Sequence, residues 1–380
     1  MRRGADPTPA TAALQARYGD QIGRARSDVS TPALLLDLDK AKHNIATMAA
    51  KFRELPADLR PHFKAHKSPQ LARLQVEAGA IGVACATIWE AVVTAEAGLV
   101  DVLIANQLVQ PDQIRAAAEL ARSHRLTVAV DDVRNVEQLS RAAVDAGAEF
   151  ELLIELDVGM GRCGVRSHIE TLPLAERIAE LPGLKLRGVE AYEGHCMLEP
   201  DPDKRIADAQ TANRQAIDAF DLLAERGHPV EVISAGGTGT YHITGANPRI
   251  HEVQAGSYVL MDAMHRPLVP GGFEVAVTVA STVLSRQGST VVLDCGRKTV
   301  GIDFVTPPLV SHPDGRVRYY AEEHCLVDFP GPPSLDLGDV AEVMGGYGPT
   351  TVNLHDVFHV VEDGVVTDIW PVTPRGPGRP

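Results

Sequence analysis

The sequence has few cysteines, and their spacing excludes two common kinds of cysteine site. Its 380 residues contain five cysteines, and none forms a C-x-x-C pair. Neither a disulfide framework nor a structural zinc site is therefore predicted. Scattered cysteines in odd number favour a reducing compartment, and we expect a cytoplasmic protein. Arg2 and Arg3 open the chain, but no apolar stretch follows them, so no signal peptide is predicted.

Long apolar runs and a surplus of basic residues are also missing. No apolar run approaches the roughly 20 residues that a membrane-spanning helix needs. Acidic residues outnumber basic ones by 50 to 36, which gives a net charge of −14. This charge repels nucleic acids and anionic membranes, so neither is expected as a partner. An anionic cofactor would need local positive groups or helix N-termini.

The rest of the composition is that of a globular protein. Hydrophobic residues make up 44% and charged residues 23% of the chain, which excludes a mainly disordered protein. From Thr31 onward, segments with helical periodicity alternate with short apolar runs at 33–36, 81–85, 102–105, 127–130, 151–156, 184–189 and 230–234. The clearest helix covers 203–226. Such alternation predicts a parallel sheet, and the number of units predicts a (β/α)8 TIM-type barrel over residues 30–264.

The two ends of the chain differ from this pattern. Residues 1–29 are predicted to be an N-terminal extension with one helix around 10–25. After residue 264, short strands separated by Gly, Pro and Asp predict an all-β domain over 265–373, followed by a frayed tail at 374–380. No G-x-G-x-x-G follows the first strand, which argues against a dinucleotide-binding fold.

The first chemically suggestive cluster is Arg60-Pro-His-Phe-Lys-Ala-His-Lys67, placed where a short strand would end. Functional residues collect at the C-terminal strand ends of such barrels. Partial burial and neighbouring cations there would lower the pKa of Lys64 and free its amine to react with a carbonyl. A basic surface loop is the alternative, and the spacing alone does not separate the two.

Two glycine-rich turns predict a phosphate site. Ser234-Ala-Gly-Gly-Thr-Gly-Thr240 follows one apolar run, and Gln254-Ala-Gly-Ser-Tyr258 lies one unit later. Glycines let backbone N–H groups approach an anion, and hydroxyl groups add donors. One such turn is weak evidence because most are simply turns. Two at adjacent strand ends form the cup in which many barrels hold phosphate.

Two further strand ends carry candidate site residues. Arg162 follows a strand and a Gly-x-Gly turn, from which it could reach a cofactor ring; a surface ion pair is the alternative. Tyr192 and His195 end the next unit. A lone histidine is more often structural than catalytic, so His195 is a candidate only.

These stretches, in this order, resemble the D-threonine aldolase and D-serine dehydratase group, which are fold-type III pyridoxal-phosphate enzymes with an alanine-racemase-like barrel. The similarity runs from about residue 31 to 370, and Pro-His-x-Lys-x-His-Lys is its most specific motif. It implies pyridoxal 5′-phosphate as cofactor, Lys64 as the Schiff-base lysine, an amino-acid substrate and a homodimer. It also implies that the cofactor ring and phosphate are bound by Arg162, Tyr192, Thr238, Gly239, Gly256, Ser257 and Tyr258.

One departure from the family pattern concerns a metal. The family usually carries a divalent metal on a His-x-Cys or His-x-Asp pair, but Tyr347 and Pro349 stand there. Proline has no ligand atom, so the familiar site is absent from the sequence. His355 and His359 are weak replacements, because four residues along a strand is too far to chelate one ion. We expect metal-free catalysis with Tyr347, His195, His324 or Lys298 as proton-transfer group. Met197 and Leu198 also replace a Gln-His pair frequent in the aldolases.

The resulting hypothesis is a pyridoxal-phosphate-dependent lyase that cleaves a β-hydroxy-D-amino acid by a retro-aldol reaction. Three alternatives stay open: a D-serine or D-threonine dehydratase that releases ammonia, an amino-acid racemase with Tyr347 as base, and a non-catalytic pyridoxal-phosphate carrier. The predicted β-domain argues against the carrier, because the small barrel carriers of this fold lack it.

Overall fold

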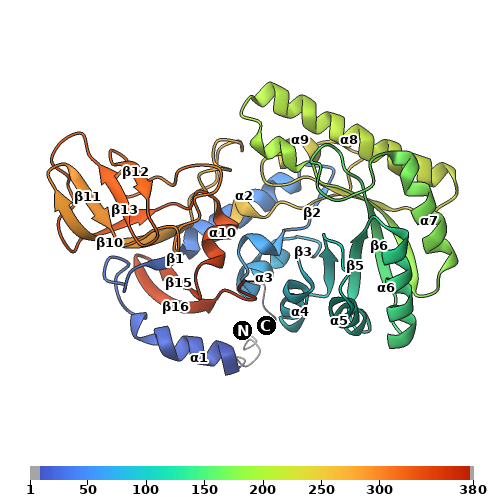
Figure 1. Cartoon of the computed structure of the whole chain (residues 1–380), viewed down its shortest axis with the longest axis horizontal. Helices are drawn as coiled ribbons and strands as arrows, with labels where there is room; N and C mark the ends of the chain where they lie inside the picture. The colour runs from blue at the N-terminus through green and yellow to red at the C-terminus, as the bar shows by residue number, and fades with distance from the viewer. Residues whose placement is uncertain (1–8, 377–380) are drawn as a thin grey trace. The chain divides into compact units, whose positions relative to one another are not determined.

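The computed structural model describes residues 9–376, and these form two compact units (Figure 1). The barrel unit comprises residues 48–64 and 72–256. The strand-rich unit comprises the described residues within 1–47, 65–71 and 257–380. Among residues 9–376, no helix is long and apolar enough to cross a bilayer.

The barrel unit is built on an eight-stranded parallel sheet. Its order is β2-β9-β8-β7-β6-β5-β4-β3, with bounds β2 (Asp58–Leu59), β3 (Val83–Cys85), β4 (Asp101–Ile104), β5 (Arg125–Val130), β6 (Phe150–Glu155), β7 (Leu184–Ala191), β8 (Val232–Ala235) and β9 (Glu252–Val253). The sheet closes because the Ala84 amide donates to the Pro61 carbonyl at 2.9 Å and His62 forms a parallel bridge with Ala84. The predicted barrel is therefore confirmed.

Helices follow the strands along the chain: α3 (Pro69–Glu77), α4 (Ile88–Glu96), α5 (Pro111–Ala121), α6 (Val133–Ala146), α7 (Thr171–Glu180), α8 (Pro202–Glu225) and the short α9 (Tyr241–Thr244). Helices α4 to α8 lie around the outside of the strands (Figure 1). The caps explain several of their starts. The Asp132 side chain accepts from the Arg134 amide at α6, and α8 begins with Pro202 directly after the capping residue Asp201.

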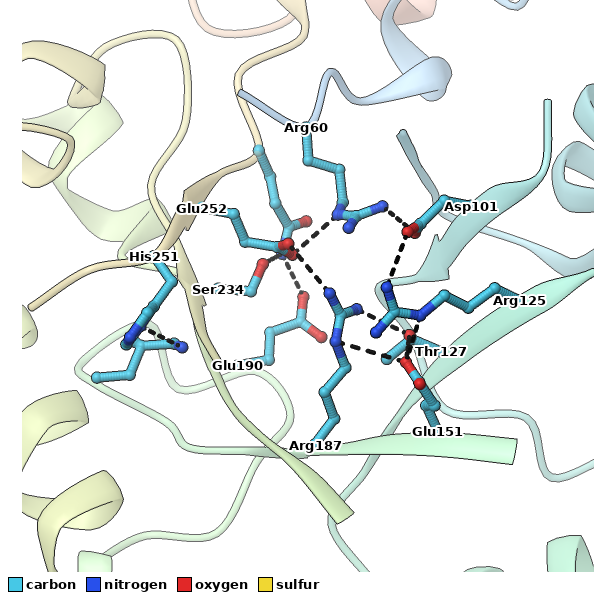
Figure 2. Close-up of polar contacts among 12 residues, drawn as sticks. Arg60, Asp101, Arg125, Thr127, Glu151, Arg187, Glu190, Ser234, His251 and Glu252 are labelled. Carbon is cyan, nitrogen blue, oxygen red and sulfur yellow. Dashed lines mark hydrogen bonds and ion pairs between the residues drawn. The ribbon is translucent and has the colours of Figure 1, made fainter. Parts of the chain in front are cut away.

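The barrel interior holds a network of buried charges (Figure 2). The guanidinium of Arg60, which is fully buried, donates from Nε to Glu252 at 2.9 Å and from Nη1 to Asp101 at 2.7 Å. Arg187 donates from Nη1 to the Thr127 hydroxyl at 3.0 Å, and its Nη2 lies 3.8 Å from Glu252. These side chains come from five strands or strand ends, so the network ties the closed sheet together across its middle.

The strand-rich unit contains a second sheet with the order β12-β13-β11-β10-β1-β15-β16, in which β14 pairs with β10. The bounds are β1 (Ala33–Asp37), β10 (Val277–Gln287), β11 (Thr290–Leu293), β12 (Arg316–Tyr320), β13 (Cys325–Asp328), β14 (Val340–Val343), β15 (Val357–Glu362) and β16 (Val365–Pro371). Strand β13 was not anticipated from the sequence.

The sequence interpretation was wrong about the strand at 33–36. It was counted among the alternating barrel segments, but β1 pairs antiparallel with β10 and parallel with β15. An apolar run of Ala33 to Leu36, fully buried on both faces, fits any central strand. Only the pairing shows which sheet it joins. Helix α2 (Leu38–Phe52) then leads from this strand toward β2.

Three smaller predictions also need correction. The helix expected at 10–25 ends earlier, because α1 covers Pro9–Tyr18 and a 3-10 turn follows. The C-terminal domain is not purely β, because α10 (Gly348–Asn353) starts with Pro349 in its first turn, where proline is tolerated. The expected frayed tail lies partly outside the described residues. Within it, Lys67 donates to the Pro374 carbonyl at 3.1 Å, and the Gly376 amide donates to Asn353 at 2.8 Å.

Candidate active site

Lys64 lies in a 3-10 turn (Phe63–Ala65) just after β2, at the C-terminal end of the barrel. Its side chain is partly buried. Burial lowers the pKa of the Lys64 ammonium, and the positive charge of Arg162 lowers it further, while Glu90 and Glu190 act in the opposite direction. A lysine with a lowered pKa has a larger neutral fraction, and the neutral amine is the form that attacks a carbonyl.

Tyr192 brings Lys64 and Arg162 together. It follows β7, and the centroid of its ring lies 5.9 Å from Lys64 Nζ and 5.6 Å from Arg162 Cζ. The ring also lies against the glycine-rich turn after β8, since a Cβ placed on Gly237 would come within 3.0 Å of Tyr192 Cε2. Three residues predicted from separate motifs therefore meet at one end of the barrel.

The Gly-x-Gly turn that carries Arg162 is held by hydrogen bonds from its backbone amides to the Asp157 side chain. The Asp157 carboxylate accepts from the Gly159 amide at 3.0 Å and from the Gly161 amide at 2.9 Å. Both glycines have positive φ, 129° and 70°, which disfavours other residues there. Arg162 Nη2 lies 3.5 Å from Glu155, so the guanidinium has a counter-charge beside the tyrosine ring.

His195 packs directly on that turn. A Cβ placed on Gly159 would come within 2.9 Å of the His195 ring, so the histidine and the glycine require each other. The His195 side chain is partly buried, and its Nδ1 is buried with no hydrogen-bond partner among the described residues. Its Nε2 lies 3.7 Å from the Cys196 thiol. The imidazole is therefore positioned by packing, with one nitrogen still able to exchange a proton.

The first predicted phosphate turn follows β8. The Gly236 amide donates to the fully buried Glu193 carboxylate at 2.9 Å, and Thr244 donates to the other oxygen of the same carboxylate. The Gly237 amide donates to the Thr240 hydroxyl at 3.1 Å. Thr238 and Gly239 lie between these fixed points and are buried. Glu193 thus supports the turn from behind, a role that the sequence interpretation missed.

The second predicted phosphate turn follows β9. Gly256 ends the barrel unit, and Ser257 and Tyr258 form a 3-10 turn (Ser257–Val259) that begins the next segment of the strand-rich unit. Tyr258 is fully buried and meets the Phe273 ring edge to face at 6.0 Å. The tyrosine is therefore packed as a core residue of its unit.

The sequence interpretation also missed two buried carboxyl groups. Glu155 ends β6 and Glu190 lies near the end of β7, and the two are direct partners in the parallel register. Burial raises the pKa of Glu155, although Gln107 and Arg162 partly offset this. Burial, followed by the charge of Glu155, raises the pKa of Glu190 to about 8. Glutamates inside otherwise apolar strand runs were the available signal.

Tyr347 has a different environment, inside the strand-rich unit. Its ring stacks on His265 with centroids 5.8 Å apart and meets Phe304 edge to face at 5.4 Å. His265 is fixed in turn by Asp262, whose carboxylate oxygens lie 2.8 and 3.0 Å from Nδ1. Burial raises the pKa of Tyr347 to about 12, and the charges of Asp262 and Asp303 act in the same direction.

The other proton-transfer candidates of that unit face solvent. Lys298 pairs with Glu323 at 2.6 Å on an exposed surface, and His324 is exposed. An exposed ion pair holds a lysine in its charged form. Neither side chain is desolvated.

The suggested metal ligands are engaged elsewhere. His355 Nε2 lies 2.7 Å from the Thr299 carbonyl, and His359, which is in β15, has Nδ1 3.3 Å from the Leu34 carbonyl. Within residues 9–376, no three His, Cys, Asp or Glu side chains are grouped as metal ligands. Tyr347 and Pro349 do not supply the family's ligand pair, and no catalytic step is assigned to a metal here.

Comparison with known proteins places this geometry in a family. Residues 36–263 match the model of the alanine racemase N-terminal domain, and residues 276–361 match that of a putative serine dehydratase domain. The chain belongs to the alanine racemase N-terminal domain family. Within this family it carries the additional serine-dehydratase-type module, which agrees with the resemblance seen in the sequence.

Relatives that match nearly the whole chain include aldolases of β-hydroxy-D-amino acids. A D-threonine aldolase from Arthrobacter sp is 36% identical over 96% of this chain and 96% of its own. A 3-hydroxy-D-aspartate aldolase from Paracoccus denitrificans is 33% identical, covering 94% of this chain and 95% of its own. The crystal structure of a D-threonine aldolase from Filomicrobium marinum has a TM-score of 0.90 at 36% identity, covering 93% and 98% of the two chains.

The family implies pyridoxal phosphate as cofactor, and the residues present fit it. Lys64 offers an amine of lowered pKa for the aldehyde, and Tyr192 offers an aromatic face beside it. In the turn at Gly236–Thr240, the Gly236 and Gly237 amides hold the turn in place, and Thr238 and Gly239 carry the backbone N–H groups that would face a phosphate. Glu190 adds a buried oxygen, Oε2, with no hydrogen-bond partner among residues 9–376, which is what an absent polar ligand leaves behind.

Proposed function

We propose that this protein is a pyridoxal-phosphate-dependent lyase that cleaves a β-hydroxy-D-amino acid into glycine and an aldehyde. The observation that carries the proposal is Lys64, held with Arg162 on the ring of Tyr192 at the C-terminal end of the barrel. Two full-length relatives with 33% and 36% identity are aldolases of β-hydroxy-D-amino acids, and they support this reaction type over the alternatives.

Lys64 is proposed to bind the cofactor, and its surroundings prepare it for this. When bound, the cofactor supplies a conjugated ring that takes up the electron pair released as the Cα–Cβ bond breaks. Arg162 and Tyr192 are proposed to hold that ring. Thr238, Gly239, Gly256, Ser257 and Tyr258 are proposed to hold its phosphate or to shape the phosphate turns.

His195 is proposed as the base that takes the proton of the substrate β-hydroxyl. As that proton leaves, the Cβ–O bond becomes a carbonyl and the Cα–Cβ bond breaks. Packing on Gly159 fixes the imidazole beside the turn that carries Arg162. An imidazole is suited to this step because its neutral form has a ring nitrogen that can accept the proton. Leu198, at the position of the usual histidine, is 61% exposed and has no group that accepts a proton.

Tyr347 is proposed to act only as a hydrogen-bond donor. A tyrosine base must lose its proton, and a pKa of about 12 keeps the phenol protonated at neutral pH. This argues against the racemase alternative. We further propose that the protein is cytoplasmic, on the basis of its scattered free cysteines. The family resemblance supports two more proposals, that it forms a homodimer and that its substrate is a small amino acid.

A product screen tests the proposal. The purified protein is incubated with pyridoxal phosphate and D-threonine, with EDTA in one series and Mn²⁺ in another. Glycine and acetaldehyde are the expected products, and their formation in EDTA would agree with the replacement of the ligand pair by Tyr347 and Pro349. Formation only with Mn²⁺ would show that metal ligands are supplied from other positions.

The same screen separates the alternatives. A keto acid with ammonia would identify a dehydratase, and L-threonine would identify a racemase. Either result would overturn the aldolase proposal, because neither reaction breaks the Cα–Cβ bond.

A further inference from the structure

An ionised Glu190 would carry a negative charge that its surroundings do not balance. Around it in the barrel, the guanidinium groups of Arg60, Arg125 and Arg187 contact the carboxylates of Asp101, Glu151 and Glu252 (Figure 2). Lys185 lies 3.9 Å from Glu151 and 3.6 Å from Glu231, so four cations meet four carboxylates and the network has no surplus positive charge for a further carboxylate. An additional buried negative charge would be uncompensated.

The neighbours of Glu190 on the other strands do not balance it either. Glu155 lies beside it in register on β6 and takes the nearby cation Arg162 at 3.5 Å. From β9, Gln254 is neutral and donates from Nε2 to Glu190 Oε1 at 3.0 Å and to the Ser234 hydroxyl at 2.9 Å. The other nearby cation is Lys64, whose own pKa burial lowers, so the two carboxyls share little positive charge and the ionisation of one disfavours that of the other.

The two oxygens of Glu190 are used differently. Oε1 accepts from Gln254, whereas Oε2 is buried and has no hydrogen-bond partner among residues 9–376. The side chain is 2% exposed, and its raised pKa agrees with a retained proton. Since Oε1 is an acceptor, the proton belongs on Oε2, and a buried donor without an acceptor costs free energy until a ligand supplies one.

Glu190 itself lies close to the residues that are proposed to hold the cofactor. Glu190 is two residues before Tyr192, so both side chains are on the inner face of the same strand end. It is also close enough to Lys64 for its charge to affect the pKa of that amine. The ring that Lys64 and Tyr192 are proposed to hold has both a nitrogen and an oxygen able to accept a proton donor.

We propose that Glu190 is a cofactor-binding residue that acts as an uncharged carboxylic acid, donating a hydrogen bond from Oε2 to an acceptor atom of the pyridoxal-phosphate ring. This deepens the proposed function and rests on it for the identity of the cofactor. The acid can donate only while it keeps its proton, so cofactor binding weakens as the carboxyl ionises on the alkaline side of neutrality.

The test compares two substitutions by cofactor affinity. Apo protein is titrated with pyridoxal phosphate, and the absorbance of the lysine-bound cofactor is followed. At about pH 6.5, Glu190→Gln keeps both an acceptor and a donor and should bind within about 3-fold of wild type. Glu190→Met has similar size but no donor and should bind about 10-fold more weakly, the usual cost of losing one buried hydrogen bond.

The pH dependence gives a second readout that a merely structural role would not change. Between about pH 6.5 and 9, wild-type affinity should fall relative to that of Glu190→Gln, because only the wild type ionises at this position. Glu151→Gln is the matched control: it removes a carboxylate of the charge network from the neighbouring strand β6, and it should leave the wild-type pH profile in place.

Each outcome decides the proposal. If Glu190→Gln binds as weakly as Glu190→Met at about pH 6.5, the carboxylate is the binding form and the proposal fails. It also fails if Glu190→Met binds like wild type. If Glu190→Met does not fold, the pH profile of Glu190→Gln decides alone. Wild-type protein that shows no lysine-bound absorbance would instead refute the cofactor, and so the proposed function.

Discussion

The two candidate proton-transfer regions differ in how they treat a buried polar side chain. At the barrel end, Lys64 lies with Arg162 on one ring, and its pKa is lowered, so the amine is pushed toward its neutral form. Around Tyr347, an aromatic cluster and two carboxylates raise the phenol pKa to about 12. Burial acts on both, but the sign of the neighbouring charges and the type of group decide which becomes reactive at neutral pH.

The reactive groups are therefore expected at the barrel end, whereas the aromatic cluster around Tyr347 has a packing role. Burial always disfavours the charged form, which makes a lysine a better nucleophile and a tyrosine a poorer base. Burial therefore makes Lys64 more reactive and Tyr347 less able to act as a base. Two measurements test this division and a third tests the charge network beneath the site; they are ordered from the largest expected effect.

Lys64→Ala should remove the lysine-bound cofactor absorbance and all measurable cleavage, because it removes the amine that lies beside the Tyr192 ring. Absorbance spectra and a glycine assay measure the two effects. Lys185→Ala serves as control, since Lys185 sits at a surface ion pair with Glu231. Retained absorbance in Lys64→Ala would show that another lysine carries the cofactor.

The second measurement compares a proton-transfer candidate from each region. His195→Asn should lower kcat on D-threonine by roughly 10²–10⁴-fold, the range for loss of a general base. Tyr347→Phe should change kcat by less than about 3-fold, because a phenol that keeps its proton cannot act as base. The reverse ranking would move the proton transfer to the strand-rich unit and contradict the comparison.

The third measurement concerns the network beneath the site. Arg60→Met leaves Glu252 and Asp101 without their buried partner and should lower the free energy of unfolding by about 3–5 kcal/mol. Urea unfolding measures this change. Arg134→Ala removes an exposed pair with Asp132 and should not change stability measurably. Equal stability of both variants would mean that the barrel relaxes around Arg60 or admits water.

The sequence predicted the helices and strands that have a clear local pattern of apolar residues. Helix α8 was expected at 203–226 and covers Pro202–Glu225, because its apolar residues recur at helical spacing. Strand β1 was recognised as a strand but assigned to the wrong sheet, because an apolar run does not encode its partners. Helix α10 was missed, since Gly348, Pro349 and two threonines do not show helical periodicity.

The candidate site divides in the same way. Lys64, Arg162 and Tyr192 stood out as unusual residue types at strand ends, and the structure brings them onto one ring. The roles of Glu190 and Glu193 did not stand out. A glutamate in a strand pattern is normally predicted to face solvent, and only the pairing of the strands shows that it points into the barrel.

The sequence by itself determined the alternation that makes a barrel, the motif that carries Lys64, and the replacement of the family's metal pair by Tyr347 and Pro349. These depend on local spacing and residue type. The tertiary structure decided which sheet β1 joins and that Glu155 lies beside Glu190. It also decided that burial lowers the pKa of Lys64 and raises the pKa of Tyr347. Pairing, burial and charge balance depend on residues distant in the chain, and no local pattern records them.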